Sequence, residues 1–213
     1  MQIAGFDAAL AHVTVGDERV ALWQVADLER HVDRAALLGA ENPPEPPYWA
    51  YLWSGARVLA DVIPPRAGTV LELGCGLGLP GLVAALRGAR VTFLDRVPAA
   101  LAFVRASANA NDVVDARFVV ADATSAVVRA RFDLVLVAEL LYDRALFGPL
   151  ASALAGSIAP GGRALLADAG RTDTQAFYPA LEALGLRWGA VECIVREERP
   201  PVTVRLVEIL PAA

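Results

Sequence analysis

Lysine is absent from the sequence, and all 19 of its basic residues are arginine. These arginines are scattered along the chain, and the formal net charge is −5 at pH 7. The broad positive field that attracts the phosphate backbone of DNA or RNA is therefore missing. We expect no nucleic-acid partner.

Cysteine and histidine are scarce. The two cysteines, Cys75 and Cys193, suit a reducing compartment and two free thiols better than a disulfide framework. The two histidines, His12 and His31, have no cluster of cysteines or carboxylates around them in the sequence. We therefore expect no metal site.

Long hydrophobic runs are also lacking, although 56% of the residues are hydrophobic. The apolar runs are about five to ten residues long, which is too short to cross a bilayer. The first residues, Met1–Asp7, lack a basic stretch followed by a long apolar one, so they do not resemble a secretory signal. We expect a cytoplasmic protein that does not contact a membrane.

The chain has 213 residues, enough for one well-buried core. Residues 42–47 contain four prolines, which lack backbone donors and suit neither a helix nor a central strand. We expect a rigid, exposed segment there, with residues 1–42 as an N-terminal appendage and residues 43–213 as the main domain. Within the appendage, His12–Val25 is strand-like around a turn at residues 16–17, and Ala26–Leu38 favours a helix.

Short apolar runs alternate with helical segments in the main domain. Because the runs are apolar at successive positions, we expect strands covered on both faces, in a doubly wound, mostly parallel α/β sheet of seven strands. The expected parallel strands are Thr69–Leu73, Arg90–Asp95, Arg117–Ala121, Phe132–Ala138 and Arg163–Asp168, and the expected helices are Leu77–Arg87, Pro98–Ala110, Arg144–Ile158 and Asp173–Leu184.

The last two apolar runs, Leu186–Arg196 and Val202–Leu210, are joined by a link too short for a parallel crossover. We expect them to form an antiparallel pair at the end of the sheet. In a sheet of this kind the ligand binds at the carboxyl ends of the parallel strands.

A glycine-rich turn follows the first of these strands and contains Gly74, Gly76 and Gly78. Glycine permits a positive φ and a close approach of the backbone to a ligand. The turn alone does not identify the ligand, because Gly76, Gly78 and Gly81 also fit the dinucleotide pattern G-x-G-x-x-G.

Glu72 favours S-adenosylmethionine over NAD as the ligand. This acid lies within the expected buried strand, two positions before Gly74, and a buried acid needs a partner. In methyltransferases an acid near this position accepts hydrogen bonds, directly or through water, around the methionine ammonium of S-adenosylmethionine, whereas such an acid would repel the pyrophosphate of NAD. The alternative is a structural carboxylate that caps a loop.

Two aspartates follow the next two strands. Asp95 comes 21 residues after Gly74, the spacing at which an acid reaches the ribose hydroxyls of an adenine nucleoside. Asp122 is placed to accept a hydrogen bond from the adenine amino group. Either residue has an ordinary alternative, because an aspartate also caps helices and turns.

With these residues in place, the sequence resembles the seven-β-strand (class I) S-adenosylmethionine-dependent methyltransferases, and among them the lysine methyltransferases. Three blocks carry the resemblance: residues 46–59 with their two tryptophans, residues 71–96 with the glycine turn and Asp95, and residues 132–143 with Glu139-x-x-Tyr142.

The resemblance implies a cofactor site and an acceptor site. The implied cofactor residues are Trp53, Glu72, Gly74, Cys75, Gly76, Gly78, Asp95, Arg96, Asp122, Ala123 and Ala138, and the implied acceptor residues are Glu139 and Tyr142. The methyl donor would leave as S-adenosylhomocysteine. Because the chain has no lysine of its own, a lysine acceptor must come from a partner protein.

Within the family, residues 49–59 and 166–171 are most similar to the branch that methylates the β subunit of electron transfer flavoprotein. The chain differs from that branch at two positions: Glu139 replaces the usual aspartate and Ala169 replaces the usual proline.

Elementary chemistry restricts the roles of the acceptor residues. A carboxylate such as Glu139 would raise the pKa of an incoming ammonium, so it suits a positioning role better than that of a strong base. Tyr142 would offer an aromatic wall and cation–π attraction, or it is simply a half-buried tyrosine at a helix start. Trp49 and Trp53 lie four residues apart, as on one helical face, so ordinary packing is an alternative for both.

Two other functions remain open from the sequence. A small-molecule N-methyltransferase, of the nicotinamide or amine type, would need a closed acceptor pocket. A NAD-binding or non-catalytic nucleoside-binding module would use the shifted glycine pattern.

Overall fold

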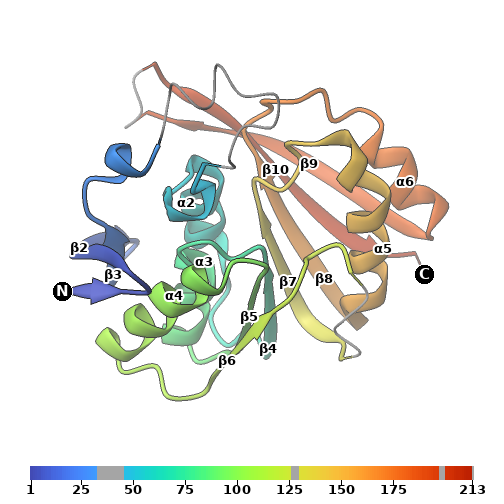
Figure 1. Ribbon diagram of the computed structural model, residues 1–213. Helices are drawn as coiled ribbons and strands as arrows, with labels where there is room; N and C mark the ends of the chain where they lie inside the picture. The colour runs from blue at the N-terminus through green and yellow to red at the C-terminus, as the bar shows by residue number, and fades with distance from the viewer. Residues whose placement is uncertain (33–45, 126–129, 197–199, 213) are drawn as a thin grey trace.

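The computed structural model describes residues 1–32, 46–125, 130–196 and 200–212. Its centre is a seven-stranded sheet with the strand order β6-β5-β4-β7-β8-β10-β9 (Figure 1). The strands are β4 (Thr69–Leu73), β5 (Arg90–Asp95), β6 (Ala116–Val120), β7 (Phe132–Ala138), β8 (Ile158–Asp168), β9 (Leu186–Val195) and β10 (Val202–Pro211). Neighbours among β4 to β8 are parallel, and β10 is antiparallel to both β8 and β9. The expected fold class is confirmed.

Helices cover both faces of this sheet (Figure 1). On one face lie α2 (Ser54–Val62), α3 (Leu79–Leu86) and α4 (Pro98–Ala110), and on the other lie α5 (Phe147–Ser157) and α6 (Phe177–Ala183). Two apolar clusters form the core, one on each side. Leu71 and Leu73 of β4 face the α5 side while Val70 faces the α3 side, so the strand is apolar on both faces.

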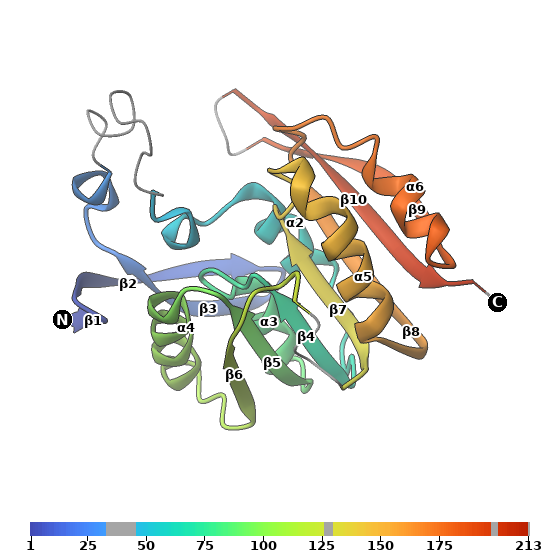
Figure 2. The same cartoon turned by 45° about the vertical axis from the view of Figure 1, so that its right-hand side comes forward.

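The N-terminal residues form a small antiparallel sheet of β1 (Gln2–Ile3), β2 (Phe6–Val15) and β3 (Glu18–Val25). The expected turn at residues 16–17 joins β2 to β3, with Val15 paired to Glu18. Val15, Val20 and Leu22 belong to the same apolar cluster as α3 and α4. This sheet therefore shares the core of the larger domain, and Figure 2 shows it beside α4.

Polar side chains of α4 hold β3 in place. The amide group of Asn111, just after α4, donates to the carbonyl oxygen of Ala21 (2.6 Å) and accepts from its backbone N–H (2.9 Å). The hydroxyl oxygen of Ser107 accepts from the backbone N–H of Trp23 at 2.9 Å. These two side chains pair with the backbone of β3 as a neighbouring strand would.

Several boundaries differ from expectation for local reasons. Helix α3 begins at Leu79 because Gly78 has φ 72° and ends the turn. Helix α6 begins at Phe177 because the carboxylate of Asp173 accepts from Gln175 N in a turn of its own. Strand β8 begins at Ile158, five residues before the expected start. Residues 160–162 are Pro-Gly-Gly, a sequence that is unusual in a strand, so the beginning of β8 was not recognised.

The expected helix at Ala26–Leu38 is wrong over its described part. Residues Leu28–His31 form only a short 3-10 helix, η1, and residues 33–38 lie outside the described residues. Most of the proline-rich segment 42–47 also lies outside them.

Strand β9 lies at one edge of the large sheet, paired with β10. Most residues of β9 are exposed to solvent, including Val191 (59% exposed) and Ile194 (57% exposed). Among the described residues, no helix is long and apolar enough to span a membrane.

The strand order reverses at β4, which lies between β5 and β7. From β4 the chain crosses to β5 on one side of β4, and it later returns to place β7 on the other side. The loops that follow β4 and β7 therefore diverge at the carboxyl ends of these strands. Such a switch point creates a crevice at the carboxyl ends of the strands.

Candidate active site

A cavity of about 870 Å³ lies at this edge of the sheet. Its walls come from the loops after β4 to β8, from residues 46–56, and from Phe6 and His31 of the N-terminal region. The cavity brings together all of the residues predicted from the sequence except Glu72: Trp53, Gly74, Cys75, Gly76, Gly78, Asp95, Arg96, Asp122, Ala123, Ala138, Glu139 and Tyr142.

The glycine turn forms the floor of the cavity. Gly74, Gly76 and Gly78 have φ values of 60°, 52° and 72°, as their residue type led us to expect. A Cβ atom at Gly76 would lie 3.0 Å from the carbonyl oxygen of Trp49, and one at Gly74 would lie 2.7 Å from the side chain of Leu140. Only glycine fits this backbone conformation at Gly74 and Gly76. The backbone of the turn is therefore not covered by side chains at these positions.

Asp95 ends β5 beside this turn. Its Oδ2 atom accepts from the backbone N–H of Gly76 and its Oδ1 atom from that of Val97, both at 2.9 Å. Burial raises the pKa of Asp95, while these two hydrogen bonds lower it. A carboxylate has about four acceptor positions, so each oxygen can accept a further hydrogen bond from a ribose hydroxyl.

Glu72 lies beneath the glycine turn instead of in the cavity lining. It is only 2% exposed, and its Oε2 atom accepts from the backbone N–H of Gly81 at 2.9 Å. Burial raises the pKa of Glu72 to about 8. This position supports the alternative considered for Glu72, a structural carboxylate that caps a loop, more than direct contact with a ligand.

Asp122 and its neighbour Ala123 lie at the β6 side of the cavity. The Oδ1 atom of Asp122 accepts from the backbone N–H of Thr124 at 2.8 Å and from its hydroxyl group. The hydroxyl bond is the larger of the two causes that hold the pKa of Asp122 below its usual value. The residue thus shapes a turn, and acceptor positions remain for a ligand.

Cys75 and Arg96 are the other two predicted residues near the turn. Cys75 is buried, and burial raises the pKa of its thiol well above the usual value. The thiol is therefore protonated and unreactive at neutral pH. Arg96 is exposed at the margin of the cavity.

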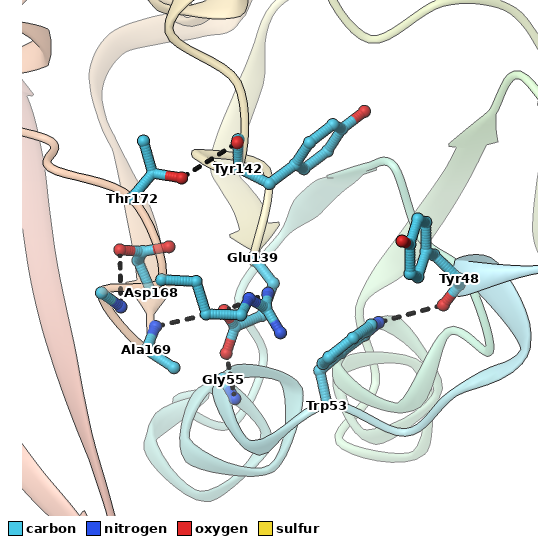
Figure 3. A network of polar contacts seen from close by, with 10 residues as sticks. Tyr48, Trp53, Gly55, Glu139, Tyr142, Asp168, Ala169 and Thr172 are labelled. Atoms are coloured by element: carbon cyan, nitrogen blue, oxygen red, sulfur yellow. Dashed lines mark hydrogen bonds and ion pairs between the residues drawn. The ribbon is translucent and has the colours of Figure 1, made fainter. Parts of the chain in front are cut away.

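Glu139 comes just after β7 and also lines the cavity (Figure 3). Its backbone has the left-handed φ of 58°, uncommon for this residue type, and its side chain is buried. Its Oε1 atom accepts from Gly55 N at 2.9 Å, and its Oε2 atom accepts from Ala169 N at 3.1 Å and from Arg171 Nη2 at 2.7 Å. Burial raises the pKa of Glu139, and the charge of Arg171 opposes this.

These three hydrogen bonds join separate segments of the chain. Gly55 is the second residue of α2, while Ala169 and Arg171 follow β8. A Cβ atom at Gly55 would lie 2.7 Å from the Oε1 atom of Glu139, so glycine is required for this contact. Glu139 is therefore a clamp that fixes the wall of the cavity.

Arg171 is a site residue that sequence reasoning did not select. Its guanidinium Cζ lies 4.0 Å from the ring centroid of Trp53, and both residues line the cavity. The indole N–H of Trp53 donates to the carbonyl oxygen of Tyr48 at 3.0 Å (Figure 3). The only sequence signal for Arg171 was its place in residues 166–171.

Trp49 and Trp53 do not share a helix, although Trp49 packs against the apolar cluster on the α4 side, as the packing alternative allows. Trp49 belongs to the 3-10 helix Tyr48–Ala50, whereas Trp53 is the N-cap of α2. The ring centroid of Trp49 lies 5.4 Å from that of Phe103 and 5.5 Å from that of Phe6. The two tryptophans thus form different parts of the cavity wall.

Three half-exposed tyrosines contribute to the cavity lining. Tyr48, Tyr51 and Tyr142 are 55%, 47% and 48% exposed, and all three line the cavity. The hydroxyl group of Thr172 donates to the carbonyl oxygen of Tyr142 at 2.9 Å, which ties the β7 loop to the β8 loop. Within the described ranges, no group of three or more His, Cys, Asp or Glu side chains could hold a metal ion.

Known methyltransferases are similar to this chain in sequence. Residues 49–138 match the methyltransferase small domain family. The protein N-lysine methyltransferase METTL21A of Mus musculus is 35% identical over 105 residues, which cover 44% of this chain and 48% of that protein. The histidine protein methyltransferase 1 homolog of Dictyostelium discoideum is 31% identical over 104 residues, 46% of this chain and 34% of that protein. The chain thus spans about half or less of these curated relatives.

Solved structures share the fold at low sequence identity. The 16S rRNA N2 G1207 methyltransferase RsmC of T. thermophilus, solved with AdoMet and guanosine, has a TM-score of 0.67 at 16% identity. The match covers 96% of this chain and 50% of that one. A TehB-like SAM-dependent methyltransferase from Corynebacterium glutamicum has a TM-score of 0.59 at 23% identity, over 85% of this chain and 96% of that one.

Proposed function

We propose that this chain is a class I S-adenosylmethionine-dependent methyltransferase and that it methylates a side-chain nitrogen of a partner protein, with lysine as the first candidate. One observation carries the proposal. The same cavity is lined by the glycine turn and Asp95 and by Glu139, Trp53 and Tyr142. Donor and acceptor residues thus open into the same space.

The residues of the cavity fit this donor. The bare backbone of the glycine turn, where a Cβ atom at Gly76 would meet Trp49, leaves room for a ligand against the loop. Asp95 retains acceptor capacity for two hydroxyl groups, and Asp122 and Ala123 would lie beside the adenine. When bound, the donor supplies a methyl group already activated on a sulfonium. The task of the chain is then to align the reactants and exclude water.

At the acceptor end the chain positions the nucleophile instead of deprotonating it. Both carboxylate oxygens of Glu139 already accept hydrogen bonds from the chain, so this residue holds the wall and is not a strong general base. The rings of Trp53 and Tyr142 provide aromatic surfaces beside it. An ammonium has no lone pair, so a lysine acceptor must lose its proton before it attacks.

The half-exposed rim supports a protein acceptor over a small molecule. Tyr48, Tyr51 and Tyr142 each contribute to the cavity and to the outer surface, so the acceptor end is open where a small-molecule enzyme would need a closed pocket. The similarity to a protein N-lysine methyltransferase supports the same acceptor class. The β subunit of electron transfer flavoprotein is the specific acceptor that residues 49–59 and 166–171 favour.

Histidine is a second candidate acceptor. The ion pair with Arg171 neutralises Glu139, which favours an acceptor nitrogen that arrives uncharged. An imidazole meets this condition near pH 7 at little cost, whereas a lysine amine does not. One of the relatives is a histidine protein methyltransferase homolog.

Transfer of labelled methyl groups from S-adenosylmethionine into a bacterial lysate, with and without added electron transfer flavoprotein, tests the proposal. Peptide mapping of any labelled protein identifies the acceptor residue. Label on lysine of the β subunit supports the proposal in full, and label on lysine of another protein keeps it without that partner. Label on histidine supports the second candidate. Label confined to small molecules, or no transfer at all, would contradict a protein methyltransferase.

A further inference from the structure

The N-terminal sheet contributes directly to the cavity. Phe6, the first residue of β2, and His31, the last of η1, are both part of the lining. Among the residues that the structure describes, every other lining residue lies between Pro46 and Thr172, in the part of the chain that carries the large sheet. The two rings therefore come from a structural unit that the expected cofactor set does not include.

These rings form a continuous aromatic wall with Trp49. The ring centroid of Phe6 lies 5.0 Å from that of His31, at 62°, and 5.5 Å from that of Trp49, at 80°. Edge-to-face contacts at such distances are favourable. The carbonyl oxygen of Trp49 in turn lies over Gly76 of the glycine turn. The wall thus stands next to the floor on which the donor would lie.

The position of the wall depends on how the small sheet docks onto α4. Phe103, Ser107 and Asn111 are spaced four residues apart and follow one face of that helix. Ser107 and Asn111 hold β3 through its backbone, and Phe103 contacts Phe6 with ring centroids 6.4 Å apart. Docking of the small sheet along this face of α4 therefore also places Phe6 in the cavity.

We infer that the N-terminal sheet completes the methyl-donor site, with Phe6 and His31 as binding residues, and that donor binding tightens the docking of this sheet onto α4. The inference rests on the proposed function, since it takes the S-adenosyl group as the ligand of the cavity. A ligand that contacts both units binds the docked state preferentially and so stabilises it.

Titration calorimetry with S-adenosylhomocysteine tests the binding role. In Phe6→Ala we expect the dissociation constant to rise about tenfold, because one aromatic contact surface is lost. Leu10→Ala is the matched control, since Leu10 is 44% exposed on the same strand and does not line the cavity. His31→Ala should weaken binding, and His31→Phe, which keeps a ring, should restore it.

Hydrogen exchange on the unaltered protein tests the coupling without any variant. The amides of Ala21 and Trp23 donate to Asn111 and Ser107, so their exchange reports docking directly. Saturating S-adenosylhomocysteine should slow both amides about tenfold or more. Amides of the distant edge strand β9 provide the reference.

The outcomes separate this inference from the proposed function. If the unaltered protein does not bind S-adenosylhomocysteine, the donor assignment fails and the inference fails with it. If it binds, but Phe6→Ala binds equally well or Ala21 and Trp23 exchange at the same rate with and without ligand, the inference alone is wrong.

Discussion

The guanidinium of Arg171 lies over the ring of Trp53, with 4.0 Å between its Cζ atom and the ring centroid, and the same group donates to the buried carboxylate of Glu139. The arginine is 38% exposed while the glutamate side chain is 2% exposed. Arg171 thus connects an aromatic wall of the cavity to the clamp behind it. Loss of either contact would release the other, because one planar group makes both.

Replacement of Arg171 by alanine should reduce methyl transfer without weakening donor binding. The wall at Trp53 would lose its support, and Glu139 would keep a buried charge with two hydrogen bonds instead of three. We expect kcat/KM for the protein acceptor to fall at least about tenfold and stability to fall by about 1–2 kcal/mol, allowing for the exposure of the pair. Steady-state kinetics and S-adenosylhomocysteine calorimetry measure the two effects.

Arg144→Ala is the control for that variant. Arg144 pairs with Asp173 at 2.8 Å, but both side chains are mostly exposed and neither lines the cavity. This variant should behave like the unaltered protein. An Arg171→Ala enzyme with full activity would remove Arg171 from the acceptor site.

Replacement of Asp95 by alanine should weaken the binding of S-adenosylhomocysteine by about 1–3 kcal/mol, because charge-assisted hydrogen bonds to the ribose are lost. Calorimetry gives the change, and Asp115→Ala is the control, since Asp115 is exposed and outside the cavity. Equal affinities for all three proteins would exclude Asp95 from the donor site.

The buried carboxyl of Glu72 should make stability depend on pH. Its pKa is about 8 in the folded protein against an ordinary value of 4.5, so the folded state holds this proton more tightly than the unfolded state. The stabilisation is fully present below about pH 4.5 and is lost as the pH rises through 8, by about 1.4 kcal/mol per pH unit. Glu72→Gln keeps an acceptor for Gly81 N and should remove this slope.

Urea unfolding at pH 5.5 and pH 8.5 measures the slope. The glutamine variant should be the more stable protein at pH 8.5, with the gap narrowing at pH 5.5. Asp133→Asn is the control, because backbone and hydroxyl hydrogen bonds from Thr69 hold the pKa of Asp133 below its ordinary value of 3.8, so its carboxylate stays ionised over this range and the substitution should leave the slope unchanged. Parallel pH profiles for Glu72→Gln and the unaltered protein would mean that Glu72 is ionised in the fold.

Asn111→Ala should destabilise the docking of the N-terminal sheet by about 1–3 kcal/mol, because a backbone donor and acceptor of Ala21 lose their partner. Urea unfolding followed by tryptophan fluorescence detects the loss through Trp23, which is part of β3. Asn109→Ala, on the exposed side of the same helix, should have no comparable effect. If the two variants are equally stable, the Asn111 bridge contributes little.

The sequence predicted the large sheet and the place of the glycine turn and Asp95 in the cavity because local patterns mark both. Apolar runs define β4 to β7, and the spacing from Gly74 to Asp95 follows from one βα unit. The wall formed by Trp53, Glu139 and Arg171 is different. Arg171 reaches Trp53 and Glu139 across three segments of chain, and no spacing in the sequence marks such a contact.

The contribution of Phe6 and His31 was hidden for another reason. The small sheet docks through the side chains of Ser107 and Asn111, whose partners are backbone groups and leave no trace in the sequence of β3. Glu72 was recognised in the sequence as an unusual acid in an apolar strand. The sequence did not reveal that its side chain points toward Gly81 and away from the cavity.

The exposed outer edge of β9 has a consequence for handling the protein. A ten-residue strand paired on one side, with Val191 and Ile194 largely exposed, offers a template to which a strand of another molecule can add. We expect aggregation of concentrated samples to begin at this edge. A charged residue at position 191 should suppress the aggregation and leave the cavity unchanged, because the cavity is lined by the loops after β4 to β8.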